Sequence, residues 1–236
     1  MYRTFAYVGF CIALTTSPLS AAQPIVVELF TSQGCSSCPQ ADAFLSELAK
    51  TPDLLVLSEH VDYWDYLGWK DPFASAENTR RQRDYARRLG LSYVYTPQMV
   101  VHGQRQASGS DRLSVLQLIY EAQAVPSIGV RVDRGDDGAW IARLAKAPIP
   151  GTADVWLVRF DPARLTRVSK GENGGRKIEN TNVVREFRRL GVWNGDALSL
   201  TVPQATPAAE ESRAILVQQT DTGRVLGAAR LDSGQH

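Results

Sequence analysis

Two cysteines three positions apart constrain this chain more than any other feature, because they stand between the pattern of a buried strand and that of an amphipathic helix. The β-branched apolar run at 25–30 predicts a central strand. Pro39 suits the first turn of a helix, and apolar residues follow at the spacing of one helix face: Ala41, Phe44, Leu45, Leu48 and Ala49. Cys35 and Cys38 are therefore predicted to lie where the strand passes into the helix.

Cys35 and Cys38 at that position are suited to thiol chemistry. The unpaired N–H groups and the partial positive charge of a helix N-terminus stabilise a thiolate and lower its pKa. We expect Cys35 at the exposed end and Cys38 one turn inward. Cys35 then attacks the disulfide of a partner protein, and Cys38 resolves the mixed disulfide. This chemistry requires no cofactor, only a protein thiol or disulfide partner.

Two other interpretations of the pair stay open. One is a disulfide that does not exchange. The other is a metal pair. A closed zinc site needs about four ligands, which two thiols and three scattered histidines do not supply, whereas soft thiolates such as Cys35 and Cys38, with one histidine, suit Cu(I). We assign no metal to the site and keep a copper carrier as an alternative.

Residues 1–22 have the order of a secretory signal peptide. Arg3 is their only charge, 5–14 is an apolar run shorter than a membrane span needs, and 20–22 offer small residues for cleavage. We expect cleavage after Ala22. The mature protein is then predicted to be periplasmic or secreted, with no membrane span.

The charge balance of the chain argues against two classes of binding partner. The 26 Lys and Arg are balanced by 25 Asp and Glu, so there is no basic surplus for binding nucleic acid or an anionic membrane.

Cleavage of the signal peptide removes Cys11 and leaves Cys35 and Cys38 as the remaining cysteines. A bridge over so short a loop adds little stability, and a core of this size does not need one. The pair is therefore predicted to serve chemistry.

The hydrophobic pattern divides the mature chain in two near residue 125. Strand and helix patterns alternate in 24–124, which predicts an α/β domain. Short alternating runs in 126–236 predict a mainly antiparallel β region, with a hairpin at 221–223 between its last two strands. One segment of this second region, 181–190, has the spacing of a short helix.

The strand, the CxxC pair and the helix resemble the start of thioredoxin-like proteins. The segment 85–91, followed by Tyr95-Thr96-Pro97, extends the resemblance. In that fold the proline is cis and faces the two cysteines. The resemblance therefore implies a thioredoxin-like α/β domain at 24–124, with Thr96 and Pro97 in a groove that receives the partner's chain.

The same resemblance suggests a proton-transfer residue. Thioredoxins carry a buried Asp six residues before the first cysteine. Here the nearest carboxylate is Glu28, seven residues before Cys35. Glu28 is thus the candidate for proton transfer that the resemblance offers.

Longer motifs are similar to those of the DUF1223 family, a group of exported, thioredoxin-like bacterial proteins without a settled function. These motifs lie at 28–39, 60–69, 95–101, 171–176 and 182–185. The last two extend the similarity beyond the thioredoxin-like part. Apart from the resemblance, we interpret 171–176 as a turn, because it lacks the strand-to-helix context of a phosphate loop, and His60 as a structural or surface residue.

The sequence thus predicts an extracytoplasmic thiol–disulfide oxidoreductase that acts on protein partners, with Cys35 as nucleophile and Cys38 as resolver. The direction of exchange and the oligomeric state do not follow from the residues. The alternative from another class is a non-catalytic binding protein of the same fold, either a Cu(I) carrier or a module that docks a partner.

Overall fold

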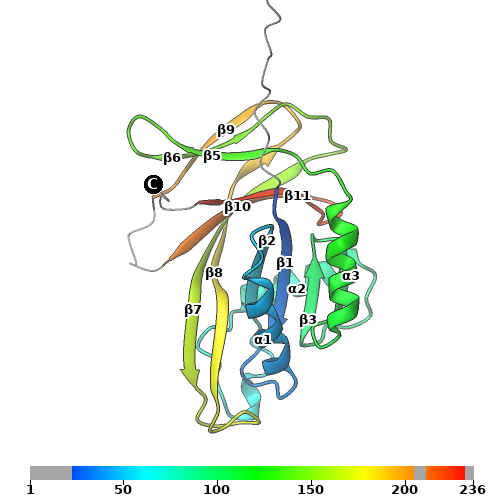
Figure 1. The fold of residues 1–236 in the computed structure, drawn as a ribbon, viewed down its shortest axis with the longest axis vertical. Helices are drawn as coiled ribbons and strands as arrows, with labels where there is room; N and C mark the ends of the chain where they lie inside the picture. Colours follow the sequence, from blue (N-terminus) through cyan, green and yellow to red (C-terminus); the bar gives the residue numbers. More distant parts are fainter. Residues whose placement is uncertain (1–22, 205–210, 232–236) are drawn as a thin grey trace, which may run out of the picture.

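The computed structural model describes residues 23–204 and 211–231, so the predicted signal peptide at 1–22 lies outside the described residues. A mixed sheet of eight strands forms the body of this part of the chain, and a smaller antiparallel sheet lies across one end of it (Figure 1). In order across the larger sheet, the strands are β11 (Val225–Leu231), β10 (Ser212–Gln219), β7 (Ala153–Arg167), β8 (Lys177–Trp193), β2 (Leu54–His60), β1 (Ile25–Thr31), β3 (Gln98–Val101) and β4 (Arg105–Ser108).

The remaining described elements are three strands, three α-helices and one short 3-10 helix. The smaller sheet has the order β5 (Val130–Arg134), β6 (Trp140–Leu144) and β9 (Leu198–Val202). The helices are α1 (Cys38–Leu48), η1 (Asp65–Leu67), α2 (Ala76–Arg88) and α3 (Arg112–Gln123). None of them, within the ranges described, has the length and apolar content that a membrane crossing requires.

Strand β1 is the centre of the N-terminal part. It runs parallel to β2 and antiparallel to β3, and its seven residues are all buried. Because side chains alternate along a strand, Val27 and Leu29 pack against α1 and α3, whereas Phe30 packs with Tyr85 of α2 on the other face. Figure 1 shows α1 and α3 in front of the sheet and α2 behind it.

The same sheet continues into the C-terminal part. Strand β8 runs parallel to β2, where Ser58 pairs with Val183, and the side-chain amide of Asn182 donates to the carbonyl of Val56 at 2.8 Å. Strands β7, β10 and β11 follow beyond β8. The regions predicted at 24–124 and 126–236 therefore share one sheet, and the α/β part and the antiparallel part are joined edge to edge.

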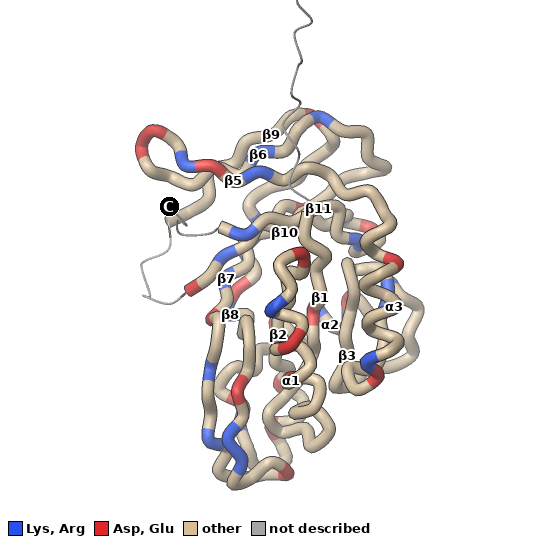
Figure 2. The backbone as a smooth tube through the Cα atoms, viewed as in Figure 1, with Lys and Arg blue, Asp and Glu red and all other residues tan. Residues whose placement is uncertain are grey.

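The smaller sheet covers a second apolar core at the end of the larger one. This core brings β5, β6 and β9 onto the buried side chains of β7, β10 and β11, with Trp193 at its centre among the largest fully buried side chains. Charged residues of both signs are spread along the backbone, and basic residues gather toward the tip of the β7–β8 hairpin (Figure 2). They are Arg164, Arg167, Lys170, Arg176 and Lys177.

The segment 181–190, whose spacing is ambiguous and fits a short helix, lies inside strand β8. Two irregularities in the β7–β8 pairing explain the helical spacing. Along β8 the register skips Arg185 and then Leu190. Each β-bulge inserts one residue and breaks the two-residue alternation of a strand. The apolar residues of β8 therefore recur at three- and four-residue intervals, although the backbone is extended.

Two turns meet at Gly103 and tie the halves together a second time. Gly103 has φ +68°, and a Cβ there would lie 2.0 Å from the carbonyl oxygen of Gly223 in the β10–β11 turn. The amide of Val225 donates to the carbonyl of His102 at 3.0 Å in the same contact. Only a residue without a side chain fits between these backbones.

Gly103→Ala should therefore lower the free energy of unfolding by more than the strain of the left-handed backbone alone would. Gly90→Ala is the matched control, since Gly90 also has φ +68° but nothing lies within 4 Å of the added Cβ. We expect a loss of about 1–2 kcal/mol for Gly90→Ala from the φ value, and a further loss of about 1–3 kcal/mol for Gly103→Ala from the forced separation of the turns. Urea unfolding of both variants measures the difference. Equal losses would refute the close approach.

Candidate functional site

Cys35 and Cys38 form a disulfide at the junction of β1 and α1, with their Cα atoms 5.5 Å apart. The predicted junction is confirmed: α1 begins at Cys38, and Ser37 is its N-cap. A turn leads into it, in which the amide of Cys35 donates to the carbonyl of Ser32 at 3.1 Å and that of Cys38 to the carbonyl of Cys35 at 3.3 Å.

The expected exposure of Cys35 is wrong. Cys35 is 2 % exposed and Cys38 is 0 % exposed. Cys35 precedes the first residue of α1 by three positions, so it lies in the turn before the helix and not at an open helix end. The adjacent Ser36 and Ser37, in contrast, are exposed.

A loop from the C-terminal part covers the turn that carries Cys35. We call residues 168–176, between β7 and β8, the cover loop. The buried side-chain amide of Asn173 donates to the carbonyl of Gln33 at 3.0 Å and to that of Cys35 at 2.8 Å. The carboxylate of Glu172 accepts from the amide of Ser36 at 3.1 Å. The predicted turn at 171–176 is thus the part of the chain that binds the backbone of the turn carrying Cys35.

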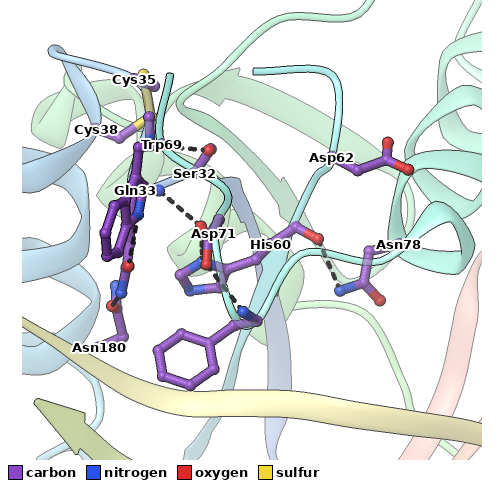
Figure 3. Close-up of polar contacts among 12 residues, drawn as sticks. Ser32, Gln33, Cys35, Cys38, His60, Asp62, Trp69, Asp71, Asn78 and Asn180 are labelled. Carbon is purple, nitrogen blue, oxygen red and sulfur yellow. Dashed lines mark hydrogen bonds and ion pairs between the residues drawn. A yellow bond between two sulfur atoms is a disulfide. The ribbon is translucent and has the colours of Figure 1, made fainter. Parts of the chain in front are cut away.

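Gln33 is the centre of a hydrogen-bonded layer beneath the disulfide (Figure 3). Its side chain donates to Asn180 of β8 at 3.0 Å and accepts from the indole of Trp69 at 3.2 Å. Its backbone amide donates to Asp71 at 2.8 Å. These bonds link the turn before Cys35 to β8 and to the aromatic loop after β2.

His60 and Asp71 form a buried pair in the same layer. Nδ1 of His60 lies 2.7 Å from Oδ2 of Asp71, and both side chains are fully buried (Figure 3). Burial acts to raise the pKa of Asp71. The charge and hydrogen bond of His60, with the backbone N–H groups of Gln33 and Phe73, together hold that pKa below its ordinary value. His60, expected to be structural or at the surface, is 0 % exposed next to the site.

Asp42 is the residue of this site that the sequence analysis missed. It lies on the buried face of α1 with Cys38, Ala41 and Leu45. Burial raises the pKa of its carboxyl from 3.8 to about 6, opposed by the charge of His60 and by the nearby hydroxyl of Thr31. The spacing of Asp42 from Cys38, one turn along the apolar stripe of α1, was the signal that could have found it.

Several polar atoms around Asp42 lack a hydrogen bond. We call Thr31, Asp42, His60 and Asn180 the buried polar cluster. Within the described part of the chain, Oγ1 of Thr31, Oδ1 of Asp42, Nε2 of His60 and Nδ2 of Asn180 are all buried and make no hydrogen bond. These atoms come from β1, α1, β2 and β8 respectively, so four elements direct unsatisfied polar groups into the interior beneath the disulfide. Native proteins leave few buried polar groups unpaired, so each of these atoms requires an explanation.

The structure places Glu28 away from the cysteines. Its two carboxylate oxygens accept from Nε of Arg81 at 2.7 Å and from the hydroxyl of Tyr85 at 2.5 Å. Both partners belong to α2. Since Val27 and Leu29 point toward α1, Glu28 points to the opposite face of the sheet from Cys38.

Thr96 and Pro97 directly precede β3, and the peptide bond between them is cis, as the resemblance implied. Oγ1 of Thr96 accepts from the indole of Trp64 at 2.7 Å. A Cβ at Gly109 would lie 2.9 Å from Cβ of Ala41 and 3.1 Å from Cβ of Pro97. Pro97 therefore stands close to α1, beside the turn of the helix that follows Cys38.

The fold and the site define a mixed α/β protein with a covered CxxC disulfide between a strand and a helix. The chain belongs to the DUF1223 family, described as "Protein of unknown function", whose profile matches residues 26–218. The family named from the sequence motifs is thereby confirmed.

Two solved structures are similar to this chain. One is the crystal structure of an Agrobacterium tumefaciens protein, with 32% identity and a TM-score of 0.77, covering 91% of this chain and 96% of that one. The other is HBP35 of Porphyromonas gingivalis, with 9% identity and a TM-score of 0.58, covering 89% of this chain and 74% of that one. At that identity the second shows similarity of fold alone. No curated protein is significantly similar to this chain.

Removing the amide that anchors the cover loop should expose Cys35. Asn173→Ala removes the side-chain donor from the carbonyl of Gln33 and leaves that of Cys35 with the amide of Cys38 alone, at a cost of about 1–3 kcal/mol that favours the open loop. We expect iodoacetamide to alkylate Cys35 roughly tenfold faster in the reduced variant than in the reduced wild type. Mass spectrometry of the labelled peptide measures the rate. Asn194→Ala, in the exposed β8–β9 turn, should leave the rate unchanged.

The raised pKa of Asp42 should appear as a pH dependence of stability. The folded protein binds this proton more tightly than the unfolded chain, so stability falls as the pH rises from about 4 to about 6. Asp42→Asn removes this loss. We expect the free energy of unfolding of Asp42→Asn, relative to wild type, to rise by about 2.5 kcal/mol between pH 4 and pH 7.

Urea unfolding at each pH measures this difference. Asp136→Asn, in the exposed β5–β6 turn, should follow the wild-type curve. Parallel curves for wild type and Asp42→Asn would show that the carboxyl of Asp42 titrates normally.

Proposed function

We propose that this protein is an extracytoplasmic thiol–disulfide oxidoreductase that acts on protein partners through Cys35 and Cys38. The observation that carries the proposal is the disulfide between these two residues at the junction of β1 and α1. A disulfide that closes so short a loop contributes little to stability, so chemistry is the better reason for its presence. The extracytoplasmic location rests on the predicted signal peptide at 1–22.

We also propose that residues 24–124 form a thioredoxin-like unit. The pair lies between a buried central strand and a helix, as in that fold. Helix α2 is followed by Gly90 in a left-handed conformation and an apolar Leu91, then by Thr96 and Pro97. The cis Pro97 near α1 is the proline that the resemblance expects to face the two cysteines.

The exchange reaction has two steps. A thiolate of the partner attacks Sγ of Cys35, the bond between Cys35 and Cys38 breaks, and its electron pair leaves on Sγ of Cys38. A second thiolate of the partner then displaces Cys35 from the mixed disulfide. The partner gains a disulfide and the protein holds two thiols. Run backwards, the same steps reduce a partner, and the relative reduction potentials decide the direction.

The cover loop restricts this reaction to open states of the site. Attack on Sγ of Cys35 requires an incoming thiolate to approach along the line of the disulfide, and Cys35 is 2 % exposed. Displacement of Asn173 and Glu172 from the turn would free this approach.

The burial of both cysteines also favours one alternative, a non-catalytic binding protein whose disulfide does not exchange. Its surface would dock a partner without any reaction of sulfur. For the Cu(I) carrier, the described residues hold no group of three or more His, Cys, Asp or Glu side chains placed to bind a metal ion.

Trapping separates exchange from binding. If exchange is the function, Cys38→Ser should accumulate a mixed disulfide through Cys35, because the resolving thiol is missing. Cys35→Ser should trap little, since Cys38 lies on the buried face of α1, whereas Cys35 lies in the turn beneath the cover loop and becomes accessible when that loop opens. Non-reducing gels with a disulfide-containing model protein such as insulin, followed by mass spectrometry, measure both.

Insulin reduction by the wild type, with dithiothreitol as the electron source, is the companion assay. Failure of the wild type in this assay, together with no trapping by Cys38→Ser, would reject exchange and leave the binding protein. Stoichiometric Cu(I) binding that both serine variants lose, without trapping, would point to the carrier.

A further inference from the structure

Reduction of the disulfide leaves a buried sulfur at Cys38 that requires a proton donor. Under the exchange reaction proposed above, on which this inference rests, Sγ of Cys38 leaves as a thiolate and must gain a proton to become a thiol. Cys38 is 0 % exposed, so bulk water does not reach its sulfur in this structure. An isolated buried thiolate is costly. The proton must therefore come from a neighbouring group of the protein.

Asp42 is placed to supply it. It lies four residues after Cys38 on the same buried face of α1, and side chains at this spacing in a helix have Cβ atoms about 5–6 Å apart. Asp42 is 4 % exposed, and its carboxyl lies beside the hydroxyl of Thr31 and the side-chain amide of Asn180, with no hydrogen bond of ordinary geometry from Oδ1 to any described residue. A buried carboxyl in these surroundings can bind a proton and transfer it to a neighbouring sulfur.

The surroundings of Asp42 balance its two protonation states. His60 from β2 faces it with an unpaired Nε2, while Nδ1 of His60 is held by Asp71 from the loop after η1. Thr31 from β1 and Asn180 from β8 complete the enclosure with neutral polar groups. The charges of His60 and Asp71 act in opposite directions on the carboxyl.

We propose that Asp42 is the proton carrier for Cys38, with His60 and Asp71 as positioning residues. When a partner thiolate attacks Cys35, the electron pair of the broken bond goes to Sγ of Cys38, and the carboxyl of Asp42 transfers its proton to that sulfur. In the reverse direction the carboxylate of Asp42 takes the proton from the Cys38 thiol, and the thiolate attacks the mixed disulfide at Cys35.

The electrostatics fit this role. Burial raises the pKa of Asp42 to about 6, whereas the charge of His60 lowers it and that of Asp71 raises it. A pKa of about 6 leaves both forms accessible near neutral pH, which is the condition for efficient proton transfer.

Resolution kinetics test the proposal. Reduced protein is mixed with glutathione disulfide, and the release of glutathione by Cys38 is followed from pH 5 to pH 9. The pH profile of the wild-type rate should have a shoulder at the pH where Asp42 titrates. Asp42→Asn should resolve roughly tenfold or more slowly at pH 7, lose the shoulder, and recover at high pH where Cys38 ionises without help.

The matched control is Glu47→Gln, on the same helix but exposed and paired with Arg112. It should keep the wild-type rate and pH profile. His60→Gln should shift the shoulder without abolishing it, since His60 acts through Asp42. An Asp42→Asn profile that superimposes on wild type would overturn the proposal while leaving the exchange function intact.

A second measurement needs no variant. Carbon-13 NMR follows the carboxyl of Asp42 as a function of pH in the oxidised protein and in protein reduced with dithiothreitol. If Asp42 and Cys38 share a proton, the midpoint should move by roughly one pH unit or more on reduction. Such a shift in a protein that fails to exchange with glutathione or insulin would support the coupling and reject the function. An unchanged midpoint would overturn the coupling.

Discussion

The guanidinium of Arg81 lies where the two halves of the large sheet meet, and four elements depend on it. It donates to Glu28 of β1 at 2.7 Å and to Gln218 of β10 at 3.1 Å, and it lies 3.5 Å from Glu59 of β2. Its centre is 4.1 Å from the ring of Phe187 in β8. Loss of one partner from a buried ion pair costs about 3–5 kcal/mol, because the other charge stays behind. The continuity of the sheet across β2 and β8 thus depends on a charge from α2.

Features set by neighbouring residues could be predicted from the sequence. The strand at 25–30, the pair at its end and the helix after Pro39 follow from periodicity within about 25 residues. Features set by distant pairing could not. The contact of Ser58 with Val183 spans most of the chain, and the bulges of β8 imitate a helix because they change the spacing that distinguishes the two.

The candidate site likewise has features that could be predicted from the sequence and features that could not. The chemistry of Cys35 and Cys38 could be predicted from their spacing. The hydrogen bond from Asn173 to the carbonyl of Cys35 could not, because Asn173 belongs to a distant turn whose sequence shows no chemical motif. Asp42 was within reach of sequence reasoning, since a carboxyl on an apolar helix stripe is unusual. Glu28 shows the limit of transferring a role by position: a shift of one residue along a strand exchanges one face of the sheet for the other.

The cover loop also has a consequence for the order in which the protein is made. Synthesis proceeds from the N-terminus, and N-terminal segments begin to fold first. The turn with Cys35 is complete long before residues 168–176 exist, and the hydrogen bonds from Asn173 and Glu172 form only after β7 and the start of β8 have followed. For that interval the two thiols of the nascent chain are open to any oxidant or thiol in their surroundings. Docking of the hairpin then limits any further exchange at the pair to the open states of the cover loop.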